Sequence, residues 1–80
     1  MSLDSAEEAE VVAQDWLNNK YSNRIGRTSF NQVVLENGIW TLRADVQFRG
    51  ILSPAPKIVL LKVDSLTTKI VSFLEQQREK

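Results

Sequence analysis

The sequence IWTLRADVQFR, residues 39–49, decides the fold of this 80-residue chain. Apolar and polar residues alternate along it, so that one face holds Trp40, Leu42, Ala44, Val46 and Phe48 and the other holds Thr41, Arg43, Asp45, Gln47 and Arg49. A period of two is that of a β-strand, whose side chains point alternately to the two sides of a sheet. The stretch therefore predicts a strand with one dry face and one solvated face.

Residues 5–20 read as an amphipathic helix that precedes this strand. Ser5 and Glu8 have the spacing of a capping box, in which the serine side chain accepts a hydrogen bond from the third helical amide. Apolar residues then recur at steps of three and four, at Ala6, Ala9, Val12, Ala13, Trp16 and Leu17. The alanines let the helix approach the sheet closely, and Trp16 is expected to anchor it there.

Two further strands are predicted, over residues 27–36 and 57–64. The first places Phe30 and Val34 on one face and Val33 and Leu35 on the other, and it is followed by Asn37-Gly38. Asn-Gly between two apolar runs is the strongest short signal of a β-hairpin, because a type I′ turn needs two residues with positive φ. The second contains the unbroken apolar run Ile58 to Leu61, which is typical of a strand that is flanked or covered on both sides.

The last segment of the chain allows two interpretations. Leu66, Ile70, Phe73 and Leu74 fit a helix, whereas residues 70–73 fit a short strand that returns from a turn. The strand is favoured by the β-branched residues around the turn, which are Thr67, Thr68, Ile70 and Val71. Residues 75–80 are expected to form a polar tail.

These elements predict a single α+β domain over residues 1–80. An N-terminal helix packs on one face of an antiparallel meander sheet of three to four strands. Eighty residues bury a thin core, so each large apolar residue on a periodic face is expected to contribute to it.

The composition excludes several classes of function. The chain has 10 basic and 10 acidic residues, no cysteine and no histidine. It therefore lacks disulfides, thiolate metal sites and the commonest general base. Neighbouring carboxylates at Glu7, Glu8 and Glu10 are a solvated helix start rather than a cation site, because they point in different directions. We expect no enzyme activity, no cofactor, no membrane partner and a cytoplasmic location, since the acidic start is unlike a secretory signal.

A family resemblance points to the same kind of domain. The segment from Val63 to Phe73, VDSLTTKIVSF, resembles the strand-turn-strand of PepSY-type domains, which commonly reads V-D-x-x-T-G-x-I/V before a polar residue and an aromatic. The order of an Ala- and Glu-rich helix, a tryptophan after Gly38 and this aspartate turn extends the resemblance over most of the chain. Two features depart from the pattern: Thr68 stands at the usual glycine, and no secretory or membrane segment is present. The resemblance implies a small non-catalytic module that inhibits or binds other proteins.

The candidate interaction surface is the solvated face of the sheet. Its basic members are Arg43 and Arg49, and a solvated sheet face with cross-strand ion pairs accounts for these residues without a ligand. Apolar residues fall on the same face, at Ile39, Ile58 and Leu60, and such a strip is typical of a partner surface. The alternative is that the C-terminal segment folds over this strip and covers it with Phe73 and Leu74.

A protein-interaction module is the function that these features favour. It would bind a protein partner, or a second copy as a homodimer, through the sheet face or an unprotected edge strand. The alternative is weak nucleic-acid binding by the basic residues Arg24, Arg27, Arg43, Arg49, Lys57 and Lys62. A small-molecule carrier is disfavoured, because so short a chain can scarcely enclose a pocket between helix and sheet.

Overall fold

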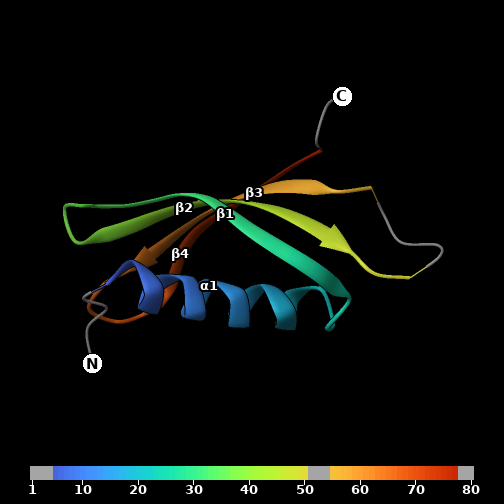
Figure 1. Cartoon of the computed structure of the whole chain (residues 1–80). Helices are drawn as coiled ribbons and strands as arrows, with labels where there is room; N and C mark the ends of the chain where they lie inside the picture. Colours follow the sequence, from blue (N-terminus) through green and yellow to red (C-terminus); the bar gives the residue numbers. More distant parts are fainter. Residues whose placement is uncertain (1–4, 51–54, 78–80) are drawn as a thin grey trace.

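A single helix lies against one face of a four-stranded antiparallel sheet (Figure 1). The structure is a computed structural model that describes residues 5–50 and 55–77. Helix α1 (Ala6–Lys20) is followed by strands β1 (Ile25–Glu36), β2 (Ile39–Phe48), β3 (Lys57–Asp64) and β4 (Ile70–Gln77). The strands lie in the order β1-β2-β3-β4, so each pairs with its neighbour in sequence. The predicted α+β meander is confirmed.

The capping box starts α1 as the sequence indicates. The Ser5 hydroxyl oxygen accepts from the Glu8 N–H at 3.2 Å, and the hydroxyl donates to a Glu8 carboxylate oxygen at the same distance. The helix ends at Lys20, after which the Tyr21 N–H donates to the Leu17 carbonyl at 3.0 Å. Ser22 then has a positive φ, which turns the chain toward β1.

The Asn37-Gly38 hairpin is also confirmed. Asn37 has φ 51° and Gly38 has φ 76°, and the flanking residues Glu36 and Ile39 are direct partners in the ladder. Positive φ at both central positions is the requirement of a type I′ turn.

A β-bulge in β1 overturns the predicted faces of that strand. Phe30 is opposite Ala44, but the next pair is Gln32 with Arg43, so Asn31 is an extra residue without a direct partner. The inserted residue reverses the alternation beyond it. Phe30, Val33 and Leu35 therefore share the helix side, and Val34 lies on the opposite side. The prediction that grouped Phe30 with Val34 was wrong because it assumed an uninterrupted alternation, whereas the bulge is defined by the pairing of β1 with β2.

The core fills the gap between α1 and the two central strands. The register places Leu42 opposite Leu61 and Ala44 opposite Val59, all facing the helix. Ala9, Ala13 and Leu17 supply the buried side of α1. The buried apolar residues are Ala9, Ala13, Leu17, Trp40, Leu42, Ala44, Val46, Val59, Leu61 and Val63. The dry face predicted for residues 40–48 is thus the floor of the core, although Phe48 at its end is only half-buried.

The C-terminal segment forms a strand rather than a helix, and the strand is longer than predicted. Asp64 initiates the turn, since one of its carboxylate oxygens accepts from the N–H groups of Leu66 at 2.8 Å and Thr67 at 3.1 Å. Strand β4 then continues to Gln77, four residues past the predicted end, in register with β3 down to Lys57. Its second half was assigned to a polar tail because an edge strand with one solvated face needs few apolar residues. Residues 78–80 of that tail lie outside the described residues.

Candidate interaction surface

One face of the sheet is covered by α1, and no described element covers the other, which we call the open face (Figure 1). Burial along β2 separates the two faces residue by residue, with Leu42, Ala44 and Val46 buried and Arg43 and Gln47 exposed. The same alternation along β3 buries the odd-numbered residues 59, 61 and 63. The remaining side chains of these strands form the open face.

The register assembles an apolar cluster at one place on the open face. Leu60 of β3 lies opposite Leu74 of β4, and Ile58 is two residues from Leu60 along the same strand. Leu74 is 57% exposed, whereas Ile58 and Leu60 are half-buried by their neighbours within the sheet. We call Ile58, Leu60 and Leu74 the open-face cluster.

Charged groups border the open-face cluster on the side of β2. Arg43 is opposite Leu60, and Asp45 is opposite Ile58. The Asp45 carboxylate accepts a hydrogen bond from the side-chain amide of the bulged Asn31 at 3.2 Å. Among the described residues no hydrogen bond or ion pair occupies the Arg43 guanidinium, which leaves it available to a ligand beside the apolar cluster.

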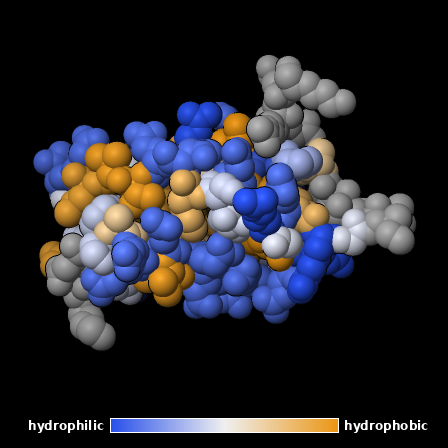
Figure 2. Space-filling view, in the orientation of Figure 1, coloured by the Kyte–Doolittle hydropathy of each residue, from blue (hydrophilic) through white to orange (hydrophobic). Residues whose placement is uncertain are grey.

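Three of the five predicted surface residues come together, and two lie elsewhere. Arg43, Ile58 and Leu60 are cross-strand or same-strand neighbours. Ile39 is on the same face but at the hairpin end, where it pairs with Glu36 and Asp64. In the space-filling view apolar groups reach the surface over the strand layer at this hairpin end (Figure 2).

Arg49 has a structural role that the sequence did not reveal. Its guanidinium donates to the Asn23 carbonyl, and its N–H donates to the Arg24 carbonyl at 2.9 Å. These bonds join the end of β2 to the chain that enters β1. Arg49 therefore holds the end of β2 against the segment before β1, and it lies away from the open-face cluster.

Leu74 lies on the open face but was not among the surface residues predicted from the sequence. The sequence allowed Phe73 and Leu74 to cover the apolar strip together. Instead they alternate along β4: Phe73 is opposite Leu61 on the helix side, and Leu74 extends the open face. Only the pairing of β4 with β3 separates these roles, because two adjacent apolar residues fit either arrangement.

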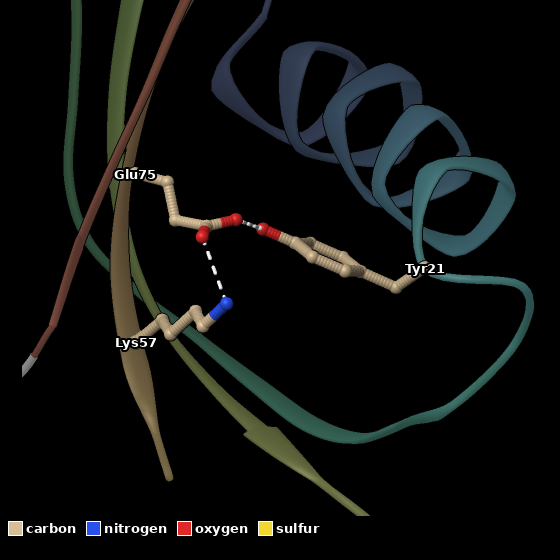
Figure 3. Close-up of polar contacts among 3 residues, drawn as sticks. All are labelled: Tyr21, Lys57 and Glu75. Carbon is tan, nitrogen blue, oxygen red and sulfur yellow. Dashed lines mark hydrogen bonds and ion pairs between the residues drawn. The ribbon is translucent and has the colours of Figure 1, made fainter. Parts of the chain in front are cut away.

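A polar cluster on the opposite side joins the end of α1 to β4 (Figure 3). The Tyr21 hydroxyl donates to one oxygen of the Glu75 carboxylate, and the Lys57 ammonium contacts the other at 2.8 Å. The bond from Lys57 and then that from Tyr21 lower the pKa of Glu75 below 4.5. Partial burial, followed by the bond to Glu75, raises the pKa of Tyr21 above 10.

This polar cluster is suited to holding elements together rather than to chemistry. The Tyr21 proton is retained on the phenol, and Glu75 is neutralised by Lys57, so neither group is poised to exchange a proton near neutral pH. The Tyr21 ring also meets Phe48 edge-on, with ring centroids 5.0 Å apart. Similar aromatic packing joins Trp16 to Phe73 at 4.9 Å and confirms Trp16 as a contact between helix and sheet.

One hollow of about 620 Å³ lies along α1, is open to solvent and is bordered by Val11 and Phe30. Among residues 5–50 and 55–77, no group of three or more acidic side chains is arranged to hold a metal ion. No helix within these ranges is both long and apolar enough to cross a membrane.

Comparison with known proteins finds no relative of this chain. No protein-family model, curated protein or solved structure matches the chain. The functional argument therefore depends on the geometry of the open face.

Proposed function

We propose that this chain is a non-catalytic protein-interaction module that binds its partner through the open face of the sheet. The observation that carries the proposal is the open-face cluster of Ile58, Leu60 and Leu74 on a surface that no described element covers. Removing apolar surface from water is worth about 25 cal/mol per Å². A partner that covers this cluster therefore gains free energy from a face that is already ordered.

The neighbouring charges define the chemistry of the partner. Asp45 is engaged by Asn31, whereas Arg43 is exposed and adjoins Leu60. An arginine at the border of an apolar patch pairs best with a carboxylate, because its planar guanidinium can donate two parallel hydrogen bonds. We therefore infer a protein surface that presents apolar side chains to the cluster and an acidic side chain to Arg43.

The PepSY-like resemblance of residues 63–73 supports the same class of function. It implies a small domain that inhibits or binds other proteins, and it assigns no catalytic residue. A second copy of the chain is one protein that could occupy the open face.

Nucleic-acid binding, the alternative, has less support from the distribution of basic residues. Lys57 is paired with Glu75 on the helix side, and Arg49 is bound to the Asn23 carbonyl. Arg27, Arg43 and Lys62 lie on the open face, but Asp45 and Glu36 are placed among them. A duplex or single strand requires a continuous basic path along its phosphates, which these positions do not provide.

Site-specific photo-crosslinking tests the proposal. A photoreactive residue is placed at Ser72, which lies on the open face opposite Lys62, and a matched control at Asn19, which is exposed on α1. We expect a discrete protein adduct from position 72 in cells that express the chain, and none from position 19. The adduct should be lost in Arg43→Glu and Leu60→Asp.

The outcomes separate the proposal from its rival. Adducts to a different protein that persist in both variants, or that form equally from position 19, would contradict binding through the open face. An increase in ionic strength from about 50 to about 200 mM weakens a nucleic-acid contact a thousandfold when six or more phosphates are bound. We expect less than a tenfold change for the protein complex, since Arg43 supplies a single ion pair.

A further inference from the structure

The two edges of the sheet are protected to different degrees. Strand β1 has an irregular register at Gly26, a bulge at Asn31 and the charged residues Arg27 and Glu36. Bulges and charges are the devices by which proteins prevent an edge from accepting another strand. Strand β4 also has an extra residue, Val71, but from residue 72 to residue 77 its register with β3 is unbroken and it contains neither proline nor bulge. Its one charged residue, Glu75, is turned toward Lys57 and Tyr21.

The hydrogen bonds of the adjoining turn show which backbone groups of β4 face outward. The Asp64 N–H donates to the Lys69 carbonyl at 2.9 Å, and the Asp64 carbonyl accepts from the Thr68 N–H at 2.8 Å. Both groups of Asp64 thus point toward β4. Because this direction alternates along a strand, residues 58, 60 and 62 point toward β4 as well, at their partners 76, 74 and 72. The N–H and carbonyl groups of Phe73 and Glu75 consequently point to the free edge.

We propose that β4 pairs with β4 of a second copy of this chain, antiparallel, with Leu74 opposite Leu74 on the two-fold axis. This inference deepens the proposed function by naming a partner for the edge, and it rests in part on that proposal. The outward groups permit this register, since Phe73 of each copy then exchanges hydrogen bonds with Glu75 of the other, and the leucine at position 74 selects it among the registers that the backbone allows. The two Leu74 residues form the central pair without hydrogen bonds, in which side chains approach most closely.

The pairing also extends the apolar surface of the open face. Leu60 is already opposite Leu74 within one chain, so the dimer aligns four leucines in one row across the two sheets. Leu74, which is 57% exposed in the single chain, becomes covered on its outer side. Other open-face positions of β4, Ser72 and Gln76, are uncharged and meet each other across the axis without repulsion.

The charges on the helix side agree with a second copy rather than with an arbitrary strand. The Lys20 ammonium lies 5.1 Å from the centre of the Phe73 ring. In the proposed register the residue opposite Phe73 is Glu75 of the other copy, which Lys57 and Tyr21 of its own chain already hold, so Lys20 of each copy lies near an acidic group and not near a like charge. An acidic strand from another protein would meet the same cation, but it would lack the matching row of leucines.

Amide hydrogen exchange at two protein concentrations tests the edge directly. The amides of Phe73 and Glu75 are unbonded in the single chain and bonded in the dimer. Between about 20 μM and about 1 mM chain, concentrations that span the weak association expected of a small interface, we expect their exchange to slow at least fivefold. The amides of Ser72, Leu74 and Gln76, which already bond β3, should change far less.

Variants and the solution mass complete the test. Leu74→Lys places two ammonium groups together on the axis and should abolish the concentration dependence, whereas Leu66→Lys, at a 74% exposed leucine in the turn, should preserve it.

In a chemically synthesised full chain, N-methylation of Glu75 removes one outward donor and keeps every side chain. We expect this chain to remain folded and to sediment as a monomer at concentrations where the unmodified chain dimerises.

The results distinguish this inference from the proposed function. A chain that remains monomeric at about 1 mM, or a dimer whose Phe73 and Glu75 amides exchange freely, overturns pairing through β4. Arg43→Glu lies two strands from the edge and should leave the exchange pattern intact while it removes a partner bound to the open face. Loss of the β4 dimer in Arg43→Glu would also contradict pairing through β4. If the partner protein still binds this variant, only the proposal of binding through the open face is contradicted.

Discussion

Thr68 occupies a turn position at which glycine is favoured. Its φ is 61°, in the left-handed region that costs a β-branched residue about 1 kcal/mol or more. Its N–H bonds to the Asp64 carbonyl, so the turn imposes this conformation.

We predict that Thr68→Gly stabilises the chain by about 0.5–1 kcal/mol. The free energy gained by relieving the left-handed strain exceeds the free energy lost because glycine raises the conformational entropy of the unfolded chain. The neighbouring Thr67→Gly is the contrast, because Thr67 is outside the set of residues with positive φ; this change relieves no strain, raises the entropy of the unfolded chain and removes the hydroxyl that accepts from the Lys69 N–H at 3.4 Å, so it should destabilise the chain. Urea unfolding measures both free energies, and a Thr68→Gly chain that is less stable than the parent would refute the assignment of strain.

At the scale of elements, the Tyr21–Glu75–Lys57 cluster ties the end of α1 to β3 and β4. Its two shifted groups give stability a dependence on pH at both extremes. The pKa of Glu75 is lowered below 4.5 by Lys57 and Tyr21, so its contribution is present above that pH and is lost as the pH falls through the folded-state pKa. The pKa of Tyr21 is raised above 10 by burial and by Glu75, so its contribution is present below pH 10 and is lost as the pH rises further.

Tyr21→Phe is therefore predicted to flatten the alkaline side of the stability profile. Above pH 10 the unfolded phenol ionises while the folded one does not, and phenylalanine removes this difference. Thermal unfolding between pH 8 and pH 12 should show a smaller fall in Tm for the variant than for the parent. Ionisation of lysines affects both chains alike, so an equal fall in the two would mean that the Tyr21 proton does not contribute.

The sequence predicted the elements better than it predicted their junctions. The alternation from Trp40 to Val46 and the spacing of Ala9, Ala13 and Leu17 report local periodicity, and the structure confirms the faces that they define. The bulge at Asn31 and the outward face of Leu74 depend on pairing with another strand, which local periodicity does not contain. Of the candidate site, Arg43, Ile58 and Leu60 were placed correctly on one face, whereas the tie made by Arg49 required the three-dimensional path of the chain.

At the scale of the whole molecule, the chain buries one face of its sheet and exposes the other. The extents of 39 × 24 × 18 Å describe a flat body of two layers. Such a body gains stability from a single apolar interface between α1 and the sheet, so the open face is expected to contribute little to folding. We therefore divide the sheet into a core face and a proposed binding face, and this division is the central claim.

Two adjacent leucines of β3 test this claim most directly. Leu61 is fully buried against the helix side, and Leu60 points to the open face. Urea unfolding of the dilute variants Leu60→Thr and Leu61→Thr compares the two positions with the same substitution, which introduces a residue that strands accept well. We predict a loss of at least about 3 kcal/mol for Leu61→Thr and of about 1 kcal/mol or less for Leu60→Thr. Equal losses at the two positions would show that the open face is part of the folding core and would contradict the account.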